Sequence, residues 1–258
     1  MLVIRKEQIE TLAQGQRKSF EDEMVAHLAE FSPPLFKVIK EAQMRKVVRH
    51  GLEMSDKYGF TLRGPIRLYL EMMLLFGSHF DTDPQYPWAA EILSDRHSVS
   101  EMQRADWLFE KIAEYQENVS GPGGANTDKA LKRLAERGKL ESEFPAKDFA
   151  YAIRHEMAQI FPEKAAYIGQ KQLNALIRKG RSVARQFELH QTQGDALMTV
   201  LCYAFGHGCA DDQLYPWIGN TLRDDKIVKP EARTERLQRK ALTWLDHVIK
   251  GNLEETQI

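Results

Sequence analysis

Two short loops contain the residues of this chain that could do chemistry. The first, Gly77–Asp83, includes His79, Asp81 and Asp83, whose imidazole and carboxylate groups are ligands for divalent metals. In the stretch 206–212 only Asp212 matches one of these residues in register, and one matched carboxylate does not make a metal site. We therefore expect Asp83 and Asp212 to cap the loop or the following helix, as Asp side chains commonly do. We expect neither a metal nor a cofactor.

The second loop also contains His207, Cys209 and Asp211, a set that could form a thiol nucleophile with a nearby base. Residues this close in one loop rarely adopt such geometry. Half a chain length before the two cysteines, Cys202 and Cys209, the sequence has methionine and phenylalanine. This exchange indicates small apolar side chains in a reducing compartment. Phosphate-loop, dinucleotide, nucleophile-elbow and zincin motifs are absent, so we expect no catalytic residue and no enzyme activity.

An aromatic motif occurs once in each half of the chain. Its residues are Tyr86, Pro87 and Trp88, and then Tyr215, Pro216 and Trp217. One interpretation is a recognition surface, because Tyr and Trp are good interface anchors. The other is a structural corner, in which Pro begins a short helix, Trp covers the end of the preceding helix and Tyr closes the loop. Retention in both halves favours the corner, because two copies of one fold are needed more often than two copies of one binding site.

The residue numbers of the two motifs differ by half the length of the 258-residue chain, a separation that we call the half-chain offset. Arg49 and Arg178 recur at the same offset. An arginine kept in both halves predicts an ion pair with a carboxylate, either inside the fold or between the halves. Asp95 and Asp224 also recur at this offset and are the candidate partners. The alternative is that the arginines form a docking site for an acidic protein.

The half-chain offset relates a much longer stretch. Residues 20–95 align without a gap to residues 149–224, and 16 of the 76 positions are identical. Chance would match about one position in sixteen. A period this long exceeds that of a solenoid repeat. It predicts an internal duplication, with a helical module at 1–119, a linker at 120–128 and a second helical module at 129–258.

Apolar spacing predicts helices throughout and no convincing strand, so the fold class is all-α with about five helices in each module. A weak strand candidate is Leu2–Ile4. Proline, glycine and capping residues mark several boundaries, including a capping box at Ser98 and Glu101 and a cap at Thr127. Helix-interior glycines at Gly51 and Gly180 predict close helix–helix contact. The expected helices cover 7–31, 41–58, 65–76, 87–93, 98–118, 129–137, 147–161, 170–187, 195–205, a short helix after 216, and 231–250.

The amino-acid composition limits the classes of function that this chain could have. Hydrophobic residues make up 43% and charged residues 28%, as in an ordinary globular protein. The formal net charge of −1 does not favour nucleic-acid binding. The formal net charge of residues 1–129 is −4 and that of the remaining residues is +3. This difference favours docking of one half on the other. No apolar run is long enough to span a membrane, and we expect a cytoplasmic protein.

The first half resembles a group of uncharacterised proteins encoded beside type VI secretion spike and effector genes in Gram-negative bacteria. The resemblance covers about residues 3–95, and the second half has it only through the repeat, without Phe80 and Pro84. The segments that carry it are Ile4–Gln8, Ser19–Val25, Leu75–Gly77 with Phe80-Asp81, and Asp83-Pro84 with Tyr86–Trp88. It implies a cytoplasmic helper, an immunity protein or a cargo component, and it supplies no catalytic residue.

These observations predict a non-enzymatic protein that binds another protein, an effector toxin or a secretion spike component, as an adaptor or chaperone. The expected site is the groove between the modules or an exposed helix face. An immunity protein that neutralises a cognate toxin is the first alternative. A secreted effector with enzymatic activity is the second.

Overall fold

The computed structural model describes residues 6–139, 144–189 and 192–255, and these residues form eleven α-helices without a strand. The all-α prediction is therefore confirmed. The strand candidate Leu2–Ile4 lies outside the described residues. The helices are α1 (Lys6–Phe31), α2 (Pro33–Lys57), α3 (Arg63–Phe76), α4 (Pro87–Ser94), α5 (Glu101–Tyr115), α6 (Ala125–Arg137), α7 (Phe149–Ile160), α8 (Pro162–Gln186), α9 (Thr192–Phe205), α10 (Pro216–Leu222) and α11 (Pro230–Glu255).

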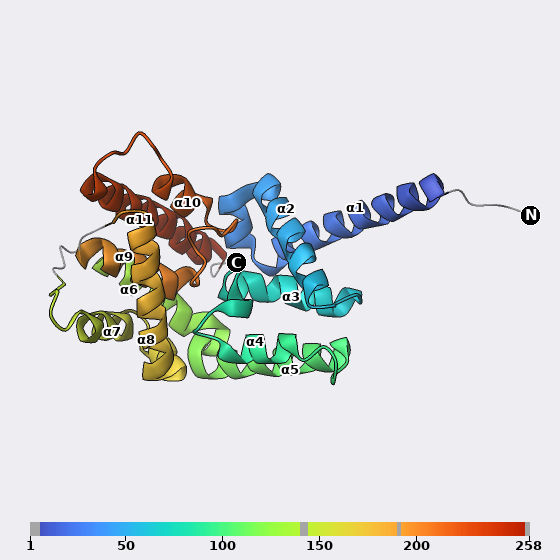
Figure 1. The fold of residues 1–258 in the computed structure, drawn as a ribbon, viewed down its shortest axis with the longest axis horizontal. Helices are drawn as coiled ribbons and strands as arrows, with labels where there is room; N and C mark the ends of the chain where they lie inside the picture. Colours follow the sequence, from blue (N-terminus) through green and yellow to red (C-terminus); the bar gives the residue numbers. More distant parts are fainter. Residues whose placement is uncertain (1–5, 140–143, 190–191, 256–258) are drawn as a thin grey trace, which may run out of the picture.

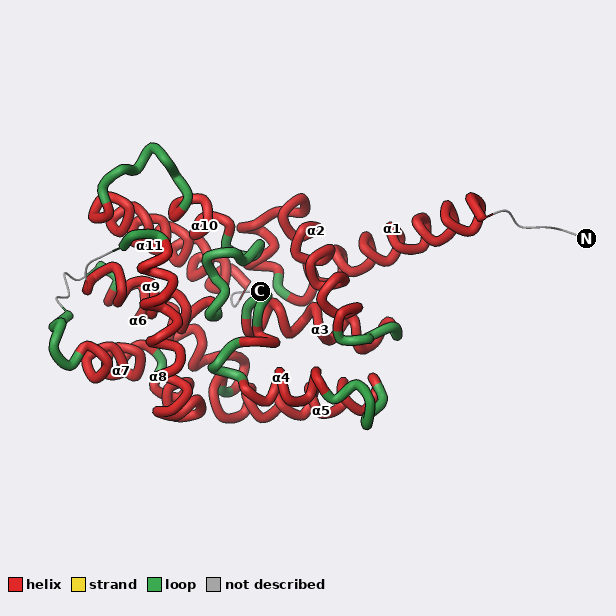
Figure 2. The backbone as a smooth tube through the Cα atoms, viewed as in Figure 1, coloured by secondary structure: helices red, strands yellow, loops and turns green. Residues whose placement is uncertain are grey.

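The helices gather into two neighbouring groups (Figures 1 and 2). Helices α2 to α5 lie on one side and α6 to α11 on the other, while the N-terminal part of α1 extends away from both. The groups touch in several places, including contacts of α11 with α2. One continuous cluster of buried apolar side chains includes residues of both groups. None of the helices within the described ranges is long and apolar enough to cross a membrane.

Proline is the first residue of five of the described helices, α2, α4, α8, α10 and α11. Pro33, Pro87, Pro162 and Pro216 each occupy the first helical turn, where the missing N–H has no intrahelical partner to lose. Helices α2 and α8 consequently begin at proline, well before the predicted starts at 41 and 170. The apolar pattern missed the first turns because each helix bends sharply where the predicted helix begins, and that bend breaks the periodicity.

The predicted capping box at Ser98 is wrong. Ser100 is the N-cap of α5, and its Oγ accepts a hydrogen bond from the Gln103 backbone N–H at 3.2 Å. Glu101 instead accepts hydrogen bonds from the backbone N–H groups of Thr61 and Leu62, at 2.6 and 3.0 Å. The carboxylate thus serves the start of α3, an element that local spacing could not connect with it.

The segment expected to link the modules contains short helical turns. A π-helical turn (η2, Gln116–Ser120) and a 3₁₀ turn (η3, Pro122–Gly124) lead into α6. Val119 is buried, and the Asn126 side chain donates to its carbonyl at 3.2 Å. Gly124, in a left-handed conformation, is the N-cap of α6 in place of the predicted Thr127.

Helices α3 and α9 are the central helices of the two groups. Each has buried side chains that recur along its length, and each packs against the preceding long helix, α2 or α8. A Cβ at Gly51 would lie 2.3 Å from Leu70 Cδ2, and one at Gly180 would lie 2.6 Å from Thr199 Cα. The predicted close helix–helix contact at both glycines is confirmed. These central helices end at the two loops that begin at Gly77 and Gly206.

Candidate functional site

The loops that follow α3 and α9 meet at the junction of the two helix groups. Gly77 and Gly206 follow these helices with φ angles of 94° and 91°. A Cβ at Gly77 would lie 2.6 Å from the Phe205 carbonyl oxygen, and one at Gly206 would lie 3.0 Å from the Phe76 carbonyl oxygen. Only glycine suits both this conformation and this approach. The two backbones therefore touch directly.

Two buried aspartates join the loops reciprocally. Asp212 accepts hydrogen bonds from the Ser78 backbone N–H at 2.8 Å and from the Ser78 hydroxyl at 2.5 Å. Asp83 accepts the His207 backbone N–H at 2.7 Å. Each aspartate also accepts the backbone N–H two residues on, at Gln85 or Leu214, at 2.8 Å. Loop capping by both aspartates is confirmed, and each also binds the opposite loop.

Burial shifts the ionisation of groups at this junction. It raises the pKa of Asp212, although hydrogen bonds from Ser78 and Leu214 act in the opposite direction. Burial also lowers the pKa of His79, against the attraction of the Asp212 carboxylate. The His79 ring centroid lies 5.5 Å from that of His50 and 6.3 Å from that of His207. Three imidazoles therefore follow one another across the junction.

The metal and thiol candidates separate in the fold. Asp81 accepts a hydrogen bond from the Tyr58 hydroxyl at 2.7 Å. No group of three His, Cys, Asp or Glu residues in the described ranges is placed to hold a metal ion. The Cys209 thiol is buried, and its contact with Cys202 Sγ at 4.0 Å, together with burial, raises its pKa. Asp211 pairs at the surface with Arg223. A thiol so protected from ionisation is a poor nucleophile.

A polar groove of about 490 Å³ opens where α2 faces the second loop. We call it the inter-half groove, because both halves supply its walls. Its lining residues are Lys46, Arg49, His50, Glu53, His79, Asp211 and Gln213. Gln43 adds a further link across the junction, donating to the Gln213 backbone carbonyl at 2.7 Å. The buried Nε2 atom of His50 has no hydrogen-bond partner within the described part of the chain.

Arg49 has a different partner from the one predicted. It binds Glu21 of α1, with Nε 3.0 Å from both carboxylate oxygens, and not Asp95. Burial raises the pKa of Glu21, but hydrogen bonds from Arg49 and Arg45 leave it below its usual value. Glu21 takes the place predicted for Asp95 because α1 packs along α2 and brings this carboxylate to the arginine.

The second arginine does not repeat this arrangement. Arg178 is exposed on α8. Asp224, its predicted partner, instead accepts the Lys226 backbone N–H at 3.1 Å. Of the two recurring arginines, only Arg49 lines the inter-half groove.

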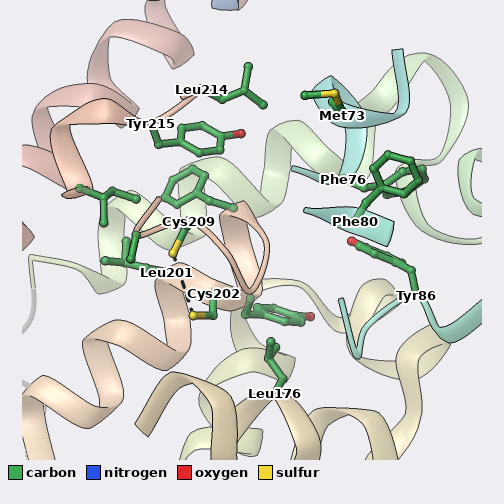
Figure 3. Close-up of a cluster of buried hydrophobic side chains, with 14 of the residues drawn as sticks. Met73, Phe76, Phe80, Tyr86, Leu176, Leu201, Cys202, Cys209, Leu214 and Tyr215 are labelled. Carbon is green, nitrogen blue, oxygen red and sulfur yellow. Dashed lines mark hydrogen bonds between the residues drawn. The ribbon is translucent and has the colours of Figure 1, made fainter. Parts of the chain in front are cut away.

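The aromatic motifs lie at the ends of the central helices. Tyr86 and Tyr215 are buried, with ring centroids 4.7 Å from Phe76 and 4.6 Å from Phe205. The rings of Trp88 and Trp217 meet the same phenylalanines edge-on, at 5.8 and 6.1 Å. Pro87 and Pro216 begin α4 and α10. In the shared apolar cluster, Tyr215 lies beside Leu214 and Cys209, whereas Tyr86 lies with Phe76 and Phe80 (Figure 3).

Another pair of residues was missed from the sequence. Arg104 donates to the Tyr58 carbonyl at 2.9 Å, and Arg233 donates to the Phe187 carbonyl at 3.1 Å. The arginines are related by the half-chain offset, and so are the carbonyls. Each arginine binds the carbonyl just after α2 or α8. The signal was present in the sequence but fell beyond the aligned window, which ends at position 95 of the first half.

Comparisons with protein families, with curated proteins and with solved structures find no match.

Proposed function

We propose that this chain is a non-enzymatic protein-binding protein, an adaptor or chaperone that loads an effector in bacterial type VI secretion. The observation that carries the binding role is the inter-half groove, a polar hollow of about 490 Å³ with walls from both halves. The secretion context is supported by the resemblance of residues 3–95. The groove is the contact site in this proposal.

The state of the reactive side chains favours binding over catalysis. Asp83 and Asp212 are buried and accept hydrogen bonds from the loops they join. Cys209 is buried beside Cys202 with a raised pKa, and Asp211 pairs with Arg223. The two aspartates and the thiol act on the fold itself, because their partners lie inside it, whereas Asp211 is held in a surface ion pair.

The chemistry of the groove indicates the partner. Arg49 already binds Glu21, and Asp211 already binds Arg223. The Lys46 ammonium is the exposed cation of the groove that is left for an incoming protein, and the exposed Glu53 carboxylate lies on the same wall. We therefore propose that an acidic segment of the effector enters the groove, where a carboxylate pairs with Lys46.

The test uses the purified chain with the effector and spike proteins encoded beside its gene. An adaptor should retain both proteins, and Lys46→Glu should weaken effector binding about tenfold or more by charge repulsion. Lys179→Glu is the matched control, because Lys179 is exposed on α8 and outside the groove. Isothermal titration calorimetry would measure both variants.

Three outcomes would contradict the proposal. Equal weakening by the two variants would remove the groove from the interface. Binding of a toxin alone, with rescue of cells from it, would indicate the immunity protein. Toxicity of the chain expressed by itself would indicate an effector.

We also infer that the two helix groups derive from one duplicated module. Support comes from helix bounds related by the half-chain offset, namely Pro33–Lys57 against Pro162–Gln186 and a shared end at Phe76 and Phe205. The bends in α2 and α8, at Lys40 and Gly169, have the same separation. So do the two arginine-to-carbonyl hydrogen bonds. Substituting Lys40 by glycine tests whether the two bends are equivalent, because glycine should then suit both helices.

A further inference from the structure

A second hollow lies away from the inter-half groove, between α3, α6, α8 and α9, and has a volume of about 230 Å³. Most of its wall is apolar, including Leu74, Leu131, Leu134 and Ile160. Among the described residues that line it, Lys164 alone carries a charge. The hydroxyl-bearing side chains are those of Tyr115, Ser120, Thr127 and Tyr203.

Lys164 is unusual because its side chain is almost completely buried, with a residue exposure of 5%. Its Nζ donates to the Tyr203 backbone carbonyl at 2.6 Å. The same atom lies 4.9 Å from the Tyr203 ring centroid and 5.7 Å from that of Tyr86. Burial lowers the pKa of Lys164 to about 8, against the attraction of Asp83. The amine is therefore still mostly protonated at neutral pH, in an apolar setting.

Two structural roles account for part of this arrangement. Tyr203 lies in the last turn of α9, where a carbonyl has no intrahelical donor, so the lysine satisfies it. A cation at this end also complements the helix dipole. The residue at the half-chain offset from Lys164 is Leu35, which is also buried. The first half therefore has no lysine at the equivalent place, and neither role requires one in this architecture. A buried ammonium without a carboxylate hydrogen-bonded to it is costly, and its retention calls for a further reason.

We propose that this cavity binds a small monocarboxylate with an apolar tail, its carboxylate paired with Lys164 and its tail against Leu74, Leu131 and Leu134. Charge complementarity selects the carboxylate, and the aliphatic wall selects the tail. The volume lies below the roughly 300–1,000 Å³ of sites for drug-sized ligands, so the ligand is small. This proposal does not depend on the adaptor function.

The experiment compares octanoate with octan-1-ol by isothermal titration calorimetry at pH 7. The two probes share a tail and differ in charge, so the native chain should bind octanoate at least tenfold more tightly. Lys164→Leu, which introduces the residue found at position 35, should abolish this preference and leave octanol binding unchanged. Lys164→Arg should keep the preference, because it keeps the charge.

Ala204→Leu is the control for the location of the site, because Ala204 also lines the cavity. This substitution should weaken the binding of both probes to a similar degree. Circular dichroism would establish that each variant is folded. The proposal is overturned if the native chain binds neither probe, if it binds both equally, or if folded Lys164→Leu retains the preference for octanoate. The relative affinity of the native chain for octanoate and octan-1-ol tests the proposal even if a variant does not fold.

Discussion

At the scale of single residues, Lys164 illustrates how burial governs ionisation. Its amine is surrounded by protein, donates to a carbonyl and lies over two tyrosine rings. Loss of hydration disfavours the charged form, which is the reason for its lowered pKa of about 8. A lowered pKa in the folded state makes stability depend on pH.

We predict that the native chain gains stability relative to Lys164→Leu as pH rises from 8 to 10.5. The unfolded lysine keeps its proton up to about pH 10.4, whereas the folded one loses it near 8. The contribution of Lys164 to stability is therefore complete above the pKa of the lysine in the unfolded chain. It is lost as the pH falls through the pKa of the lysine in the folded chain. The gain should approach about 3 kcal/mol.

Urea unfolding of both proteins at several pH values would measure this difference, because all other titrating groups cancel in the comparison. A difference in the free energy of unfolding that stays constant between pH 8 and 10.5 would show that Lys164 titrates normally.

At the scale of elements, the bends in α2 and α8 depend on a backbone conformation that normally requires glycine. Gly169 has φ 77° and ψ 163°, and Lys40 has nearly the same angles, φ 68° and ψ 165°. A side chain in this region costs about 1–3 kcal/mol. Helix α2 therefore contains strain that α8 avoids.

We predict that Lys40→Gly raises the free energy of unfolding by about 1 kcal/mol, since it relieves the strain at some entropic cost. Lys46→Gly is the control, because Lys46 is exposed in the regular part of the same helix and its replacement should cost about 1 kcal/mol. Thermal denaturation would compare them. Two variants destabilised to the same extent would show that position 40 adopts ordinary helical geometry.

At the scale of the whole molecule, the loops at the junction connect the two helix groups. Asp212 is the centre of this connection, because it accepts two hydrogen bonds from Ser78 across the junction and one from Leu214 in its own loop. All three donors are groups that would stay buried without it. Removing a buried acceptor is more harmful than removing a surface ion pair.

We predict that Asp212→Ala lowers the free energy of unfolding by about 3 kcal/mol or more, because three donors lose their acceptor. The neighbouring Asp211→Ala should change it by less than about 1 kcal/mol, since the pair with Arg223 is exposed. Urea unfolding followed by tryptophan fluorescence would measure both. Similar losses in the two variants would place Asp212 outside the stabilising contacts of the junction.

The sequence by itself determined the helical class, the helix starts at Pro87 and Pro216, the close contacts at Gly51 and Gly180, and the loop-capping role of the paired aspartates. These features depend on local conformational preference and on spacing along one helix, which are properties of neighbouring residues. The half-chain offset also indicated which positions to compare between the halves.

Only the tertiary structure decided which distant groups meet. Arg49 binds Glu21 and not Asp95. Asp83 and Asp212 each accept a hydrogen bond from the opposite loop. Lys164 lines a cavity, whereas the residue at the half-chain offset, Leu35, is uncharged. Such contacts depend on how the helices pack, since helix packing brings together residues that are 28 to 134 positions apart. Local sequence preferences do not specify that packing.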